Sequence, residues 1–271
     1  MEISVTDDIM NEKPALSGVT ETMLQTIYAR AKETRTRGAI IDSKAVEIVG
    51  KLDYDFSLAD KDAAMSDGVI ARTIVLDKLA EKFLASNPGA VVVNIACGLD
   101  TRCYRMGNYS HWYNLDLPET IAVRSKILQP TEKITQIAMS AMDDWSGEIK
   151  ERSQHALVII EGLTMYLSAE DVKQIFAVIF SCFEQVTVLV EIMNPTMAKR
   201  FKEKSIEGSK AKFTWGIKDG KALAELISGF SLVEEHGLTE GMAAFIPVYR
   251  MLDKIGPVRN ISNKIVVLKK D

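Results

Sequence analysis

Cysteine is scarce in this sequence: the 271 residues include only Cys97, Cys103 and Cys182, with no CxxC pair. An odd number of cysteines without paired spacing argues against a disulfide framework and against a zinc site. No stretch reaches the roughly 18 apolar residues that a membrane span needs, and the acidic first residues do not resemble a signal peptide. We therefore expect a cytoplasmic protein that does not associate with membranes.

An excess of basic residues is also missing. The chain has 33 Lys and Arg against 37 Asp and Glu, which gives a formal net charge of −4. Proteins that bind nucleic acids usually show the opposite balance, so no nucleic-acid partner is expected. Hydrophobic residues make up 47% of the chain and charged residues 26%, as in globular proteins that bury a full core.

The signatures of several enzyme classes are absent as well. The chain has no GxSxG, Walker or HExxH motif, so hydrolase, phosphotransferase and metalloprotease activities lack support. The three histidines, His111, His155 and His236, are far apart in the sequence. None is paired with a candidate nucleophile or acid, and we interpret all three as structural. We expect no bound metal.

Short apolar runs recur along the chain, with helix-like patterns between them. Near-continuous apolar runs are typical of strands that are buried on both faces of a parallel sheet. The alternation predicts an α/β fold with a doubly wound, mostly parallel sheet of seven strands. The predicted strands are 90–95, 112–115, 134–137, 156–160, 186–190, 230–233 and 264–268.

A single domain, residues 1–271, is the simplest organisation, since no repeat or flexible linker divides the chain. Apolar residues at helical spacing ahead of the first strand predict a helical layer. The expected segments are an N-terminal arm (1–17), the helical layer (18–88), a core that binds the cofactor (90–193), an insertion (194–220) and a segment that completes the sheet (221–271).

The first predicted strand ends in a turn of small residues, Asn94 to Arg102. Such a turn lets a ligand approach the backbone at the start of the next helix. The dinucleotide-binding pattern GxGxxG is incomplete, because Ala96 replaces the first glycine and only Gly98 remains. This weakens a nicotinamide-dependent oxidoreductase as an interpretation. Cys97 is better explained as a small buried residue than as a nucleophile.

Acidic residues follow two predicted strands at the carboxyl edge of the sheet, where ligands bind in such folds. Asp116 lies 18 residues after Gly98, close to the spacing of the acid that binds ribose hydroxyls in nucleotide-binding folds. The alternative is that Asp116 only caps the helix beginning at Pro118. Glu161 directly follows the fourth strand, and its alternative role is to bond backbone donors of a neighbouring loop.

These segments together resemble the leucine carboxyl methyltransferase family of S-adenosylmethionine-dependent enzymes. Asn94-Ile-Ala-Cys-Gly-Leu-Asp-Thr-Arg102 is similar to the family pattern nlGaGLDtR. Tyr113-Asn-Leu-Asp-Leu-Pro118 resembles y.lDlP, and Glu161-Gly-Leu-Thr-Met-Tyr-Leu167 resembles EgvlmYL. The likeness covers residues 18 to about 190 well, and it implies a class I methyltransferase fold.

The resemblance also implies roles for individual residues around S-adenosylmethionine. Gly98 matches the glycine beside the methionine part, and Asp116 matches the acid that binds the ribose. Arg72 matches the arginine that reaches the cofactor carboxylate, with Arg30 as a weaker candidate for the same pocket. Glu161 matches an acid near the methionine amino group.

Two departures from the family pattern concern the turn and the adenine. Ala96 replaces a usual glycine, although its small side chain is expected to preserve the turn. After the third strand the family often has Asp-Leu near the adenine amino group, where this chain has Ser140-Ala141-Met142-Asp143. We favour Ser140 with Ala141 for this role over a displaced Asp143.

The insertion is rich in positive charge, with eight Lys or Arg and three Asp or Glu between Lys199 and Lys221. A solvated helix face is the ordinary explanation of such a run. A cationic lid over an anionic substrate is the alternative, because loops beside sheet edges often determine specificity.

The sequence thus predicts an S-adenosylmethionine-dependent O-methyltransferase that acts on a small, possibly anionic molecule, most simply a carboxylate. A carboxylate is already ionised at neutral pH and needs no general base, which fits a chain without an evident acid–base pair. Tyr166 is expected to orient the acceptor or to pack under the insertion, and Arg72 to neutralise the acceptor as well. The alternatives are a cofactor-binding protein without activity and a methyltransferase for a protein C-terminal carboxylate.

Overall fold

The computed structural model describes residues 19–151, 155–200, 213–256 and 262–270. The predicted N-terminal arm and residues 201–212 of the predicted insertion lie outside the described residues. Within the described part, no helix combines the length and the apolar character needed to cross a membrane.

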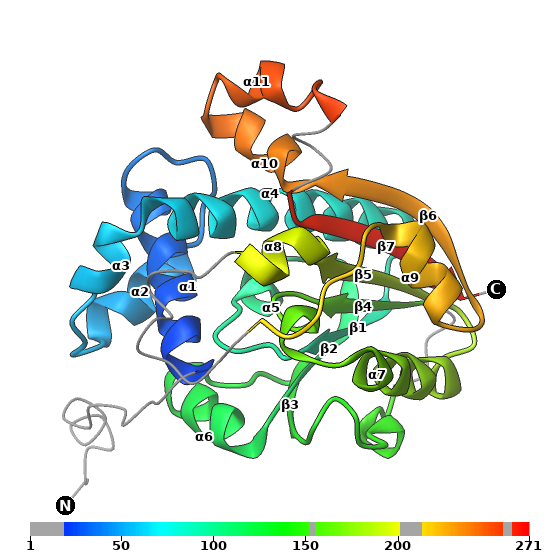
Figure 1. Ribbon diagram of the computed structural model, residues 1–271. Helices are drawn as coiled ribbons and strands as arrows, with labels where there is room; N and C mark the ends of the chain where they lie inside the picture. Colours follow the sequence, from blue (N-terminus) through cyan, green and yellow to red (C-terminus); the bar gives the residue numbers. More distant parts are fainter. Residues whose placement is uncertain (1–18, 152–154, 201–212, 257–261, 271) are drawn as a thin grey trace, which may run out of the picture.

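A seven-stranded sheet forms the centre of the molecule, with the strand order β3-β2-β1-β4-β5-β7-β6 (Figure 1). The first five strands are parallel and β7 pairs antiparallel with both β5 and β6, so the predicted mostly parallel sheet is confirmed. The strands are β1 (Ala90–Ile95), β2 (Tyr109–Asp116), β3 (Ile134–Ala138), β4 (Ala156–Ile160), β5 (Val186–Ile192), β6 (Phe230–Gly237) and β7 (Lys264–Lys270).

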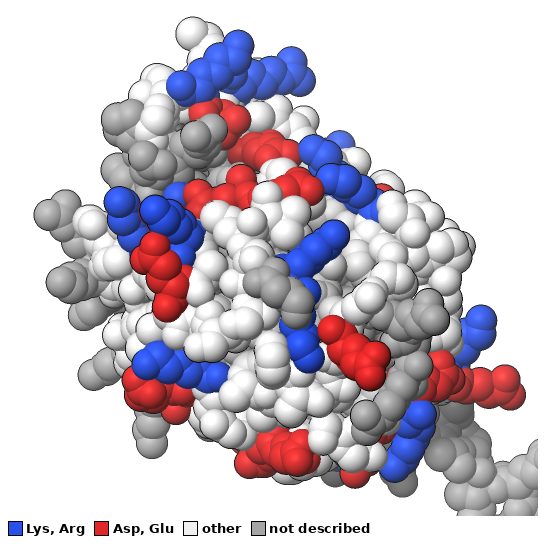
Figure 2. Space-filling model, turned by 90° about the vertical axis from the view of Figure 1, so that its right-hand side faces the viewer, with Lys and Arg blue, Asp and Glu red and all other residues white. Residues whose placement is uncertain are grey.

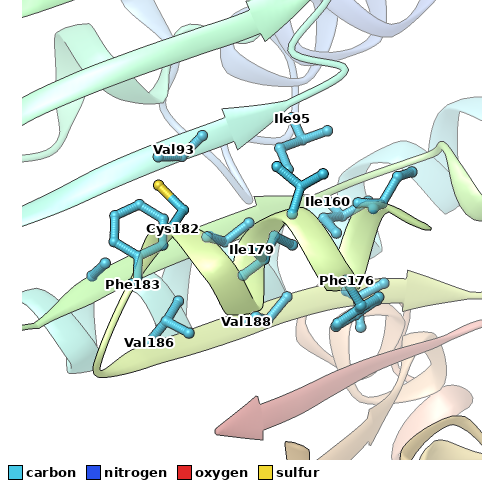
Figure 3. Packing of buried hydrophobic residues seen from close by; sticks show 14 of the residues in the cluster. Val93, Ile95, Ile160, Phe176, Ile179, Cys182, Phe183, Val186 and Val188 are labelled. Carbon is cyan, nitrogen blue, oxygen red and sulfur yellow. The ribbon is translucent and has the colours of Figure 1, made fainter. Parts of the chain in front are cut away.

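Helices cover both faces of the sheet. Every residue of β1, β4 and β5 is therefore buried. On one face α7 (Ala169–Cys182) packs its apolar stripe, including Ile179 and Cys182, against Val93 of β1 and Val188 of β5 (Figure 3). A capping box at Ser168 and Asp171 begins α7.

The opposite face is covered by α4 (Ala63–Ser86) and α10 (Leu238–Phe245). The predicted helical layer 18–88 therefore divides into two parts. Helix α4 lies on the sheet, whereas α1 (Val19–Arg35) and α2 (Ser43–Lys51) pack on each other and on α6 (Pro118–Ile127) beside it. The remaining helices are short: α3 (Ser57–Lys61), α5 (Arg102–Arg105), α8 (Pro195–Arg200), α9 (Gly220–Leu226), α11 (Tyr249–Leu252) and the 3-10 turns η2 (Ser146–Glu148) and η3 (Thr164–Tyr166).

Candidate functional site

A cavity of about 340 Å³ lies at the carboxyl ends of β1, β2 and β4, where helix α1 forms one wall. All the residues that the sequence suggested for cofactor binding or catalysis line this cavity, although they come from six separate segments. They are Arg30, Arg72, Ala96, Gly98, Asp116, Ser140, Ala141, Glu161 and Tyr166. The fold thus brings the predicted set together, and the role of each member remains a prediction.

The turn after β1 contains two residues in the left-handed region, Ala96 with φ of 54° and Gly98 with φ of 46°. Glycine adopts this conformation readily, whereas a residue with a Cβ is strained there. The turn is nevertheless formed, as the sequence analysis expected for alanine. Hydrogen bonds hold it, since the Cys97 N–H donates to the Leu115 carbonyl and the Gly98 N–H donates to Asp116 Oδ2 at 2.8 Å.

Asp116 ends β2 and has its carboxylate between the turn and α6. Besides the bond from Gly98, it accepts a hydrogen bond from the N–H of Leu117 at 2.8 Å. Burial raises the pKa of Asp116, against the opposing effect of these donors and of Arg124. The bond from the Leu117 N–H, at the N-cap position of α6, fits the helix-capping alternative, while the position in the cavity wall fits the ribose role.

Glu161 follows β4 and forms ion pairs with two arginines. Arg72 Nε lies 2.7 Å from Glu161 Oε1, and Arg102 Nη1 lies 2.6 Å from Oε2. Burial alone would raise the pKa of Glu161, but the charges of Arg102 and Arg72 outweigh it and lower the pKa. Glu161 is therefore ionised at neutral pH and is a poor base.

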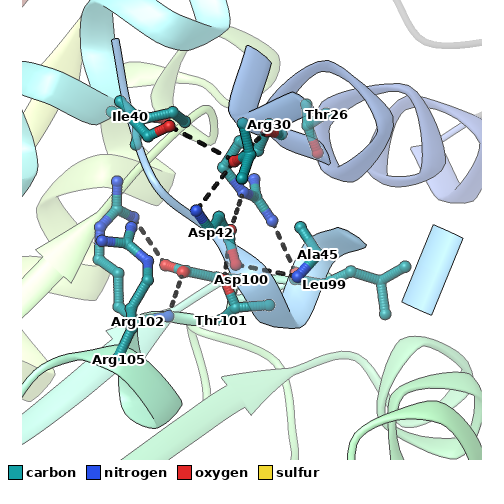
Figure 4. Close-up of polar contacts among 12 residues, drawn as sticks. Thr26, Arg30, Ile40, Asp42, Ala45, Leu99, Asp100, Thr101, Arg102 and Arg105 are labelled. Carbon is teal, nitrogen blue, oxygen red and sulfur yellow. Dashed lines mark hydrogen bonds and ion pairs between the residues drawn. The ribbon is translucent and has the colours of Figure 1, made fainter. Parts of the chain in front are cut away.

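Buried arginines also hold the turn against the helices around it (Figure 4). Arg102 reaches Asp100 on its own turn and Asp77 on α4, each at 2.7 Å. Arg102 also pairs with Glu161, so it links the turn both to α4 and to the end of β4. Arg30 of α1 pairs with Asp42 at 3.0 Å and donates to the Leu99 carbonyl at 2.8 Å. Arg30 thus connects the helical wall to the cofactor turn.

The segment after β3 places Ser140 and Ala141 in the cavity wall, while Asp143 is not among the residues that line it. The Ser140 N–H donates to Asp143 Oδ2 at 3.2 Å, so this carboxylate is engaged in the local turn. The arrangement is compatible with the preferred assignment of Ser140 and Ala141 to the adenine.

Tyr166 belongs to η3, and its ring centroid lies 5.3 Å from that of Phe213. Phe213 comes from the predicted insertion, so both expected roles of Tyr166, orienting an acceptor and packing under this segment, stay open. The basic residues Lys202, Lys204, Lys210 and Lys212 lie outside the described residues.

Glu191 was not predicted from the sequence. This side chain is fully buried in β5, accepts hydrogen bonds from the Gly162 N–H at 2.9 Å and from Asn263 at 3.0 Å, and lies 3.6 Å from Arg72 Nη1. An acid directly after the apolar run Val186–Val190 is the same signal that identified Asp116 and Glu161, so this position was accessible to the same reasoning.

None of the three histidines lines the cavity, and no cluster suited to a metal ion occurs in the described part of the chain. All three cysteines are buried free thiols. Burial raises the pKa of Cys97, which lines the cavity, so its thiol is neutral and unsuited to act as a nucleophile.

A family model described as leucine carboxyl methyltransferase matches residues 23–180 of this chain. The chain belongs to the leucine carboxyl methyltransferase family. It is accordingly an S-adenosylmethionine-dependent methyltransferase, and the resemblance seen in the motifs is confirmed.

Relatives of this family member include TcmP, the tetracenomycin polyketide synthesis O-methyltransferase of Streptomyces glaucescens. TcmP is 33% identical over 240 residues, which cover 85% of this chain and 87% of TcmP. The S-adenosyl-L-methionine-dependent methyltransferase dpfgK of Gibberella zeae is 27% identical, covering 82% and 83%. A solved structure of a candidate methyltransferase from Thermobifida fusca matches over 100% of both chains with a TM-score of 0.60 and 12% identity, which shows the fold alone.

The donors and acceptors in the cavity suit the parts of S-adenosylmethionine. A carboxylate can accept both hydroxyls of a ribose diol, and Asp116 is a half-buried carboxylate for which no ion pair at salt-bridge distance is found in the described part of the chain. An α-carboxylate and an α-ammonium need an arginine and an acid, and Arg72 and Glu161 are adjacent in the wall. The residues that this chain offers therefore fit the cofactor that its family uses.

Proposed function

We propose that this enzyme transfers a methyl group to an oxygen of a small molecule and that this oxygen belongs to a carboxylate. The proposal depends chiefly on the state of the acids in the cavity. Asp100 and Glu161 are ion-paired with Arg102, and the pKa of each is held below its usual range mainly because the arginine charges outweigh burial. Neither acid is a good base. The pKa of Asp116, the third acid of the lining, is raised by burial, but its two carboxylate oxygens accept the N–H groups of Gly98 and Leu117, and no histidine lines the cavity.

An acceptor whose oxygen is already an anion needs no proton removed before it attacks. Arg30 and Arg72 are the cations among the described residues of the lining, which also holds the acids Asp100, Asp116 and Glu161. Both arginines are ion-paired, Arg30 with Asp42 and Arg72 with Glu161, and Arg72 is the more exposed of the two, so it is the cation that an anionic acceptor would meet. TcmP, a polyketide O-methyltransferase, supports a small-molecule acceptor rather than a protein. We further infer an intracellular site of action, which the three free cysteines support.

Different residues of this chain would bind different parts of S-adenosylmethionine. Asp116 would accept the ribose hydroxyls, Arg72 and Glu161 would hold the amino-acid part, and Ser140 with Ala141 would contact the adenine. When bound, S-adenosylmethionine supplies an activated methyl group on a sulfonium. Tyr166 would orient the acceptor, and the apolar side chains of Leu163 and Leu167 beside it would exclude water.

The expected partner is a small molecule rather than a nucleic acid. On the face shown in Figure 2, Lys and Arg are interspersed with Asp and Glu and do not gather into one large basic area. This pattern supports the expectation from the net charge of −4.

Matched acceptors test the carboxylate assignment. Aromatic acids and the corresponding phenols are incubated with S-adenosylmethionine labelled at the methyl group, and the products are then treated with alkali. We expect label in the acids only, released as methanol because methyl esters hydrolyse. Alkali-stable label in the phenols would overturn the carboxylate proposal and leave the methyltransferase assignment intact.

The pH dependence gives an independent check on the same proposal. With a carboxylate acceptor, single-turnover rates at saturating substrate should be flat between pH 6 and pH 9. A rate that climbs over this range would indicate an acceptor or a base that loses a proton, and it would contradict the proposal.

A further inference from the structure

Glu191 is a buried acid that the proposed function does not use. It lies near the end of β5 with 0% of its surface exposed. Its two carboxylate oxygens accept separate hydrogen bonds, Oε2 from the Gly162 N–H at 2.9 Å and Oε1 from the side-chain amide of Asn263 at 3.0 Å. Donors on both oxygens favour the ionised form of a carboxylate. A negative charge is therefore buried beside the loop that follows β4.

The charge of Glu191 is only partly compensated. Arg72 is the one cation within ion-pair distance of it in the described part of the chain, with Nη1 3.6 Å from Oε2. The same arginine lies closer to Glu161, with Nε 2.7 Å from Oε1. Burying a carboxylate without full compensation is unfavourable, and a neutral glutamine could still accept the Gly162 N–H at a lower cost. The hydrogen bonds alone therefore do not explain an acid at this position.

The ion pairs of Arg72 belong to a network that contains more acids than arginines. Printed sequence positions far apart contribute to it, and each member is joined to the next by an ion pair. Among the described residues, the members are the arginines Arg72, Arg102 and Arg105 and the acids Asp77, Asp100, Glu161 and Glu191. Three arginines and four carboxylates leave one negative charge in excess. Three members, Arg72, Asp100 and Glu161, line the cavity, so the excess charge lies beside it.

The other buried charges around the cavity are equal in number. Arg30 pairs with Asp42 at 3.0 Å. Asp116 lies in the cavity wall, and the buried Arg124 donates to the carbonyl of Gly98 in the neighbouring turn at 2.8 Å. These four groups contribute two positive and two negative charges, so they do not offset the excess of the network.

S-adenosylmethionine has one net positive charge, because its sulfonium adds to an ammonium and a carboxylate that cancel. S-adenosylhomocysteine lacks the sulfonium charge and is neutral overall. We propose that Glu191 is a specificity-determining residue, whose negative charge makes the site favour the cationic S-adenosylmethionine over its neutral product. Charges in a protein interior interact over several ångströms, so Glu191 acts without contact with the cofactor. The inference rests on the proposed place of the amino-acid part at Arg72 and Glu161.

Calorimetric titrations of Glu191→Gln with three ligands test the inference. They are S-adenosylmethionine, S-adenosylhomocysteine and sinefungin, a cation that carries an ammonium group where the cofactor has its sulfonium. Glutamine keeps the shape of the side chain and removes its charge. We expect the ratio of the affinity for S-adenosylmethionine to that for S-adenosylhomocysteine to fall roughly fivefold in this variant. Sinefungin should weaken like S-adenosylmethionine, while S-adenosylhomocysteine should bind about as in the parent.

Glu235→Gln is the matched control. Glu235 also accepts a backbone N–H, that of Gly220 at 2.6 Å, and pairs with one cation, Lys264 at 2.6 Å, but it lies on β6 outside the network. This variant has the same net charge as Glu191→Gln and should keep the affinity ratio of the parent. An equal fall of the ratio in both variants would assign the effect to the charge of the whole molecule and overturn the proposal.

Two results with Glu191→Gln itself would overturn the proposal. Equal weakening of all three ligands would make Glu191 a structural support of the loop at Gly162, and an unchanged ratio would show that its charge does not reach the cofactor. If Glu191→Gln fails to fold, Asp77→Asn takes its place, because it removes one charge from a part of the network that does not line the cavity. Asp77→Asn should lower the ratio by a smaller factor, and a ratio equal to that of the parent would contradict the proposal.

Arg72→Lys separates failure of this inference from failure of the cofactor placement. If Arg72→Lys binds S-adenosylhomocysteine as well as the parent does, the amino-acid part does not lie at Arg72 and the inference falls with the placement. If Arg72→Lys binds more weakly but Glu191→Gln keeps the affinity ratio of the parent, only the inference about Glu191 is overturned.

Discussion

At the scale of single residues, Arg72 lies where the cofactor site and the buried ion-pair network meet. It contacts Glu161 at 2.7 Å and Glu191 at 3.6 Å, and it lines the cavity. A guanidinium can donate to several acceptors at once in a fixed planar geometry, whereas an ammonium cannot reproduce this fork. A lysine at position 72, which keeps the charge but not the planar donors, should therefore not substitute for Arg72.

We predict that Arg72→Lys binds S-adenosylhomocysteine about tenfold more weakly, because one or more charge-assisted hydrogen bonds are lost. Calorimetry measures the affinity. The matched control is Arg37→Lys, which changes an arginine paired with Glu33 and Asp67 away from the cavity and should bind like the parent. Parental affinity in Arg72→Lys would exclude a bidentate role for Arg72.

Ala96 carries the main backbone strain of the site, with φ of 54° in a residue that has a Cβ. We predict that Ala96→Gly raises the free energy of unfolding by about 0.5–1 kcal/mol, since relief of strain exceeds the added flexibility of the unfolded chain. Urea unfolding measures this. Asn108→Gly is the control, because Asn108 also has a positive φ of 66° but asparagine tolerates it, so a smaller gain is expected. An Ala96→Gly variant that is less stable than the parent would contradict the strain assignment.

The sequence predicted site residues only where a polar side chain directly follows an apolar strand. Asp116 and Glu161 stand out because each is polar at the end of an apolar run. The partners of Arg72 and Arg102 come from elements far away in the chain, such as Glu191 and Asp77, and local patterns do not encode such contacts. No sequence pattern predicted that Arg124 is buried, because arginine is seldom buried without an acidic partner.

At the scale of elements, the strands were predicted well in their apolar centres and less well at their ends. Strand β2 was expected at 112–115 and runs from Tyr109 to Asp116, because its polar ends pair with β1 and β3. Strand β6 was expected at 230–233 and extends to Gly237, since an edge strand carries exposed side chains that hide its pattern.

The contact between α10 and α4 determines where Arg72 lies along the sheet. A Cβ on Gly241 would lie 2.1 Å from the Ala71 carbonyl oxygen, so the two helices meet backbone to backbone next to Arg72. We predict that Gly241→Ala lowers the free energy of unfolding by about 1–3 kcal/mol through overpacking.

Urea unfolding of Gly241→Ala and of Gly68→Ala gives the comparison. Gly68 lies in α4 with nothing within 4 Å of its added Cβ, so alanine should stabilise the helix there by up to about 1 kcal/mol. Similar stability changes in the two variants would show that the close contact at Gly241 is unimportant.

At the scale of the whole molecule, buried carboxylates link stability to pH. Burial opposes ionisation of Asp42, Asp100 and Glu161, but neighbouring arginines outweigh it and lower the pKa of each below its value in the unfolded chain. Their contribution to stability is complete above the unfolded pKa of about 4 and is lost as the pH falls toward the folded values. Asp116 acts in the opposite direction, because burial raises its pKa.

We therefore predict that the free energy of unfolding falls by roughly 2–4 kcal/mol between pH 5 and pH 3, with the partial offset from Asp116 included. Denaturant unfolding at a series of pH values measures the fall. The loss should persist in 1 M salt, which screens exposed pairs such as Lys51–Glu47 but not buried ones. A stability that is independent of pH in this range would contradict the ionised network.

The central claim is that Asp116 holds the ribose of S-adenosylmethionine in the cavity at the ends of β1, β2 and β4. Calorimetric titration of S-adenosylhomocysteine into the parent, Asp116→Ala and Asp62→Ala tests it most directly. Asp62 caps α4 through the Met65 N–H at 2.9 Å and does not line the cavity, so its variant controls for the loss of a helix cap. The account predicts that Asp116→Ala binds at least about tenfold more weakly than the parent while Asp62→Ala binds normally. Equal binding by the parent and Asp116→Ala would reduce Asp116 to a helix cap and contradict the claim.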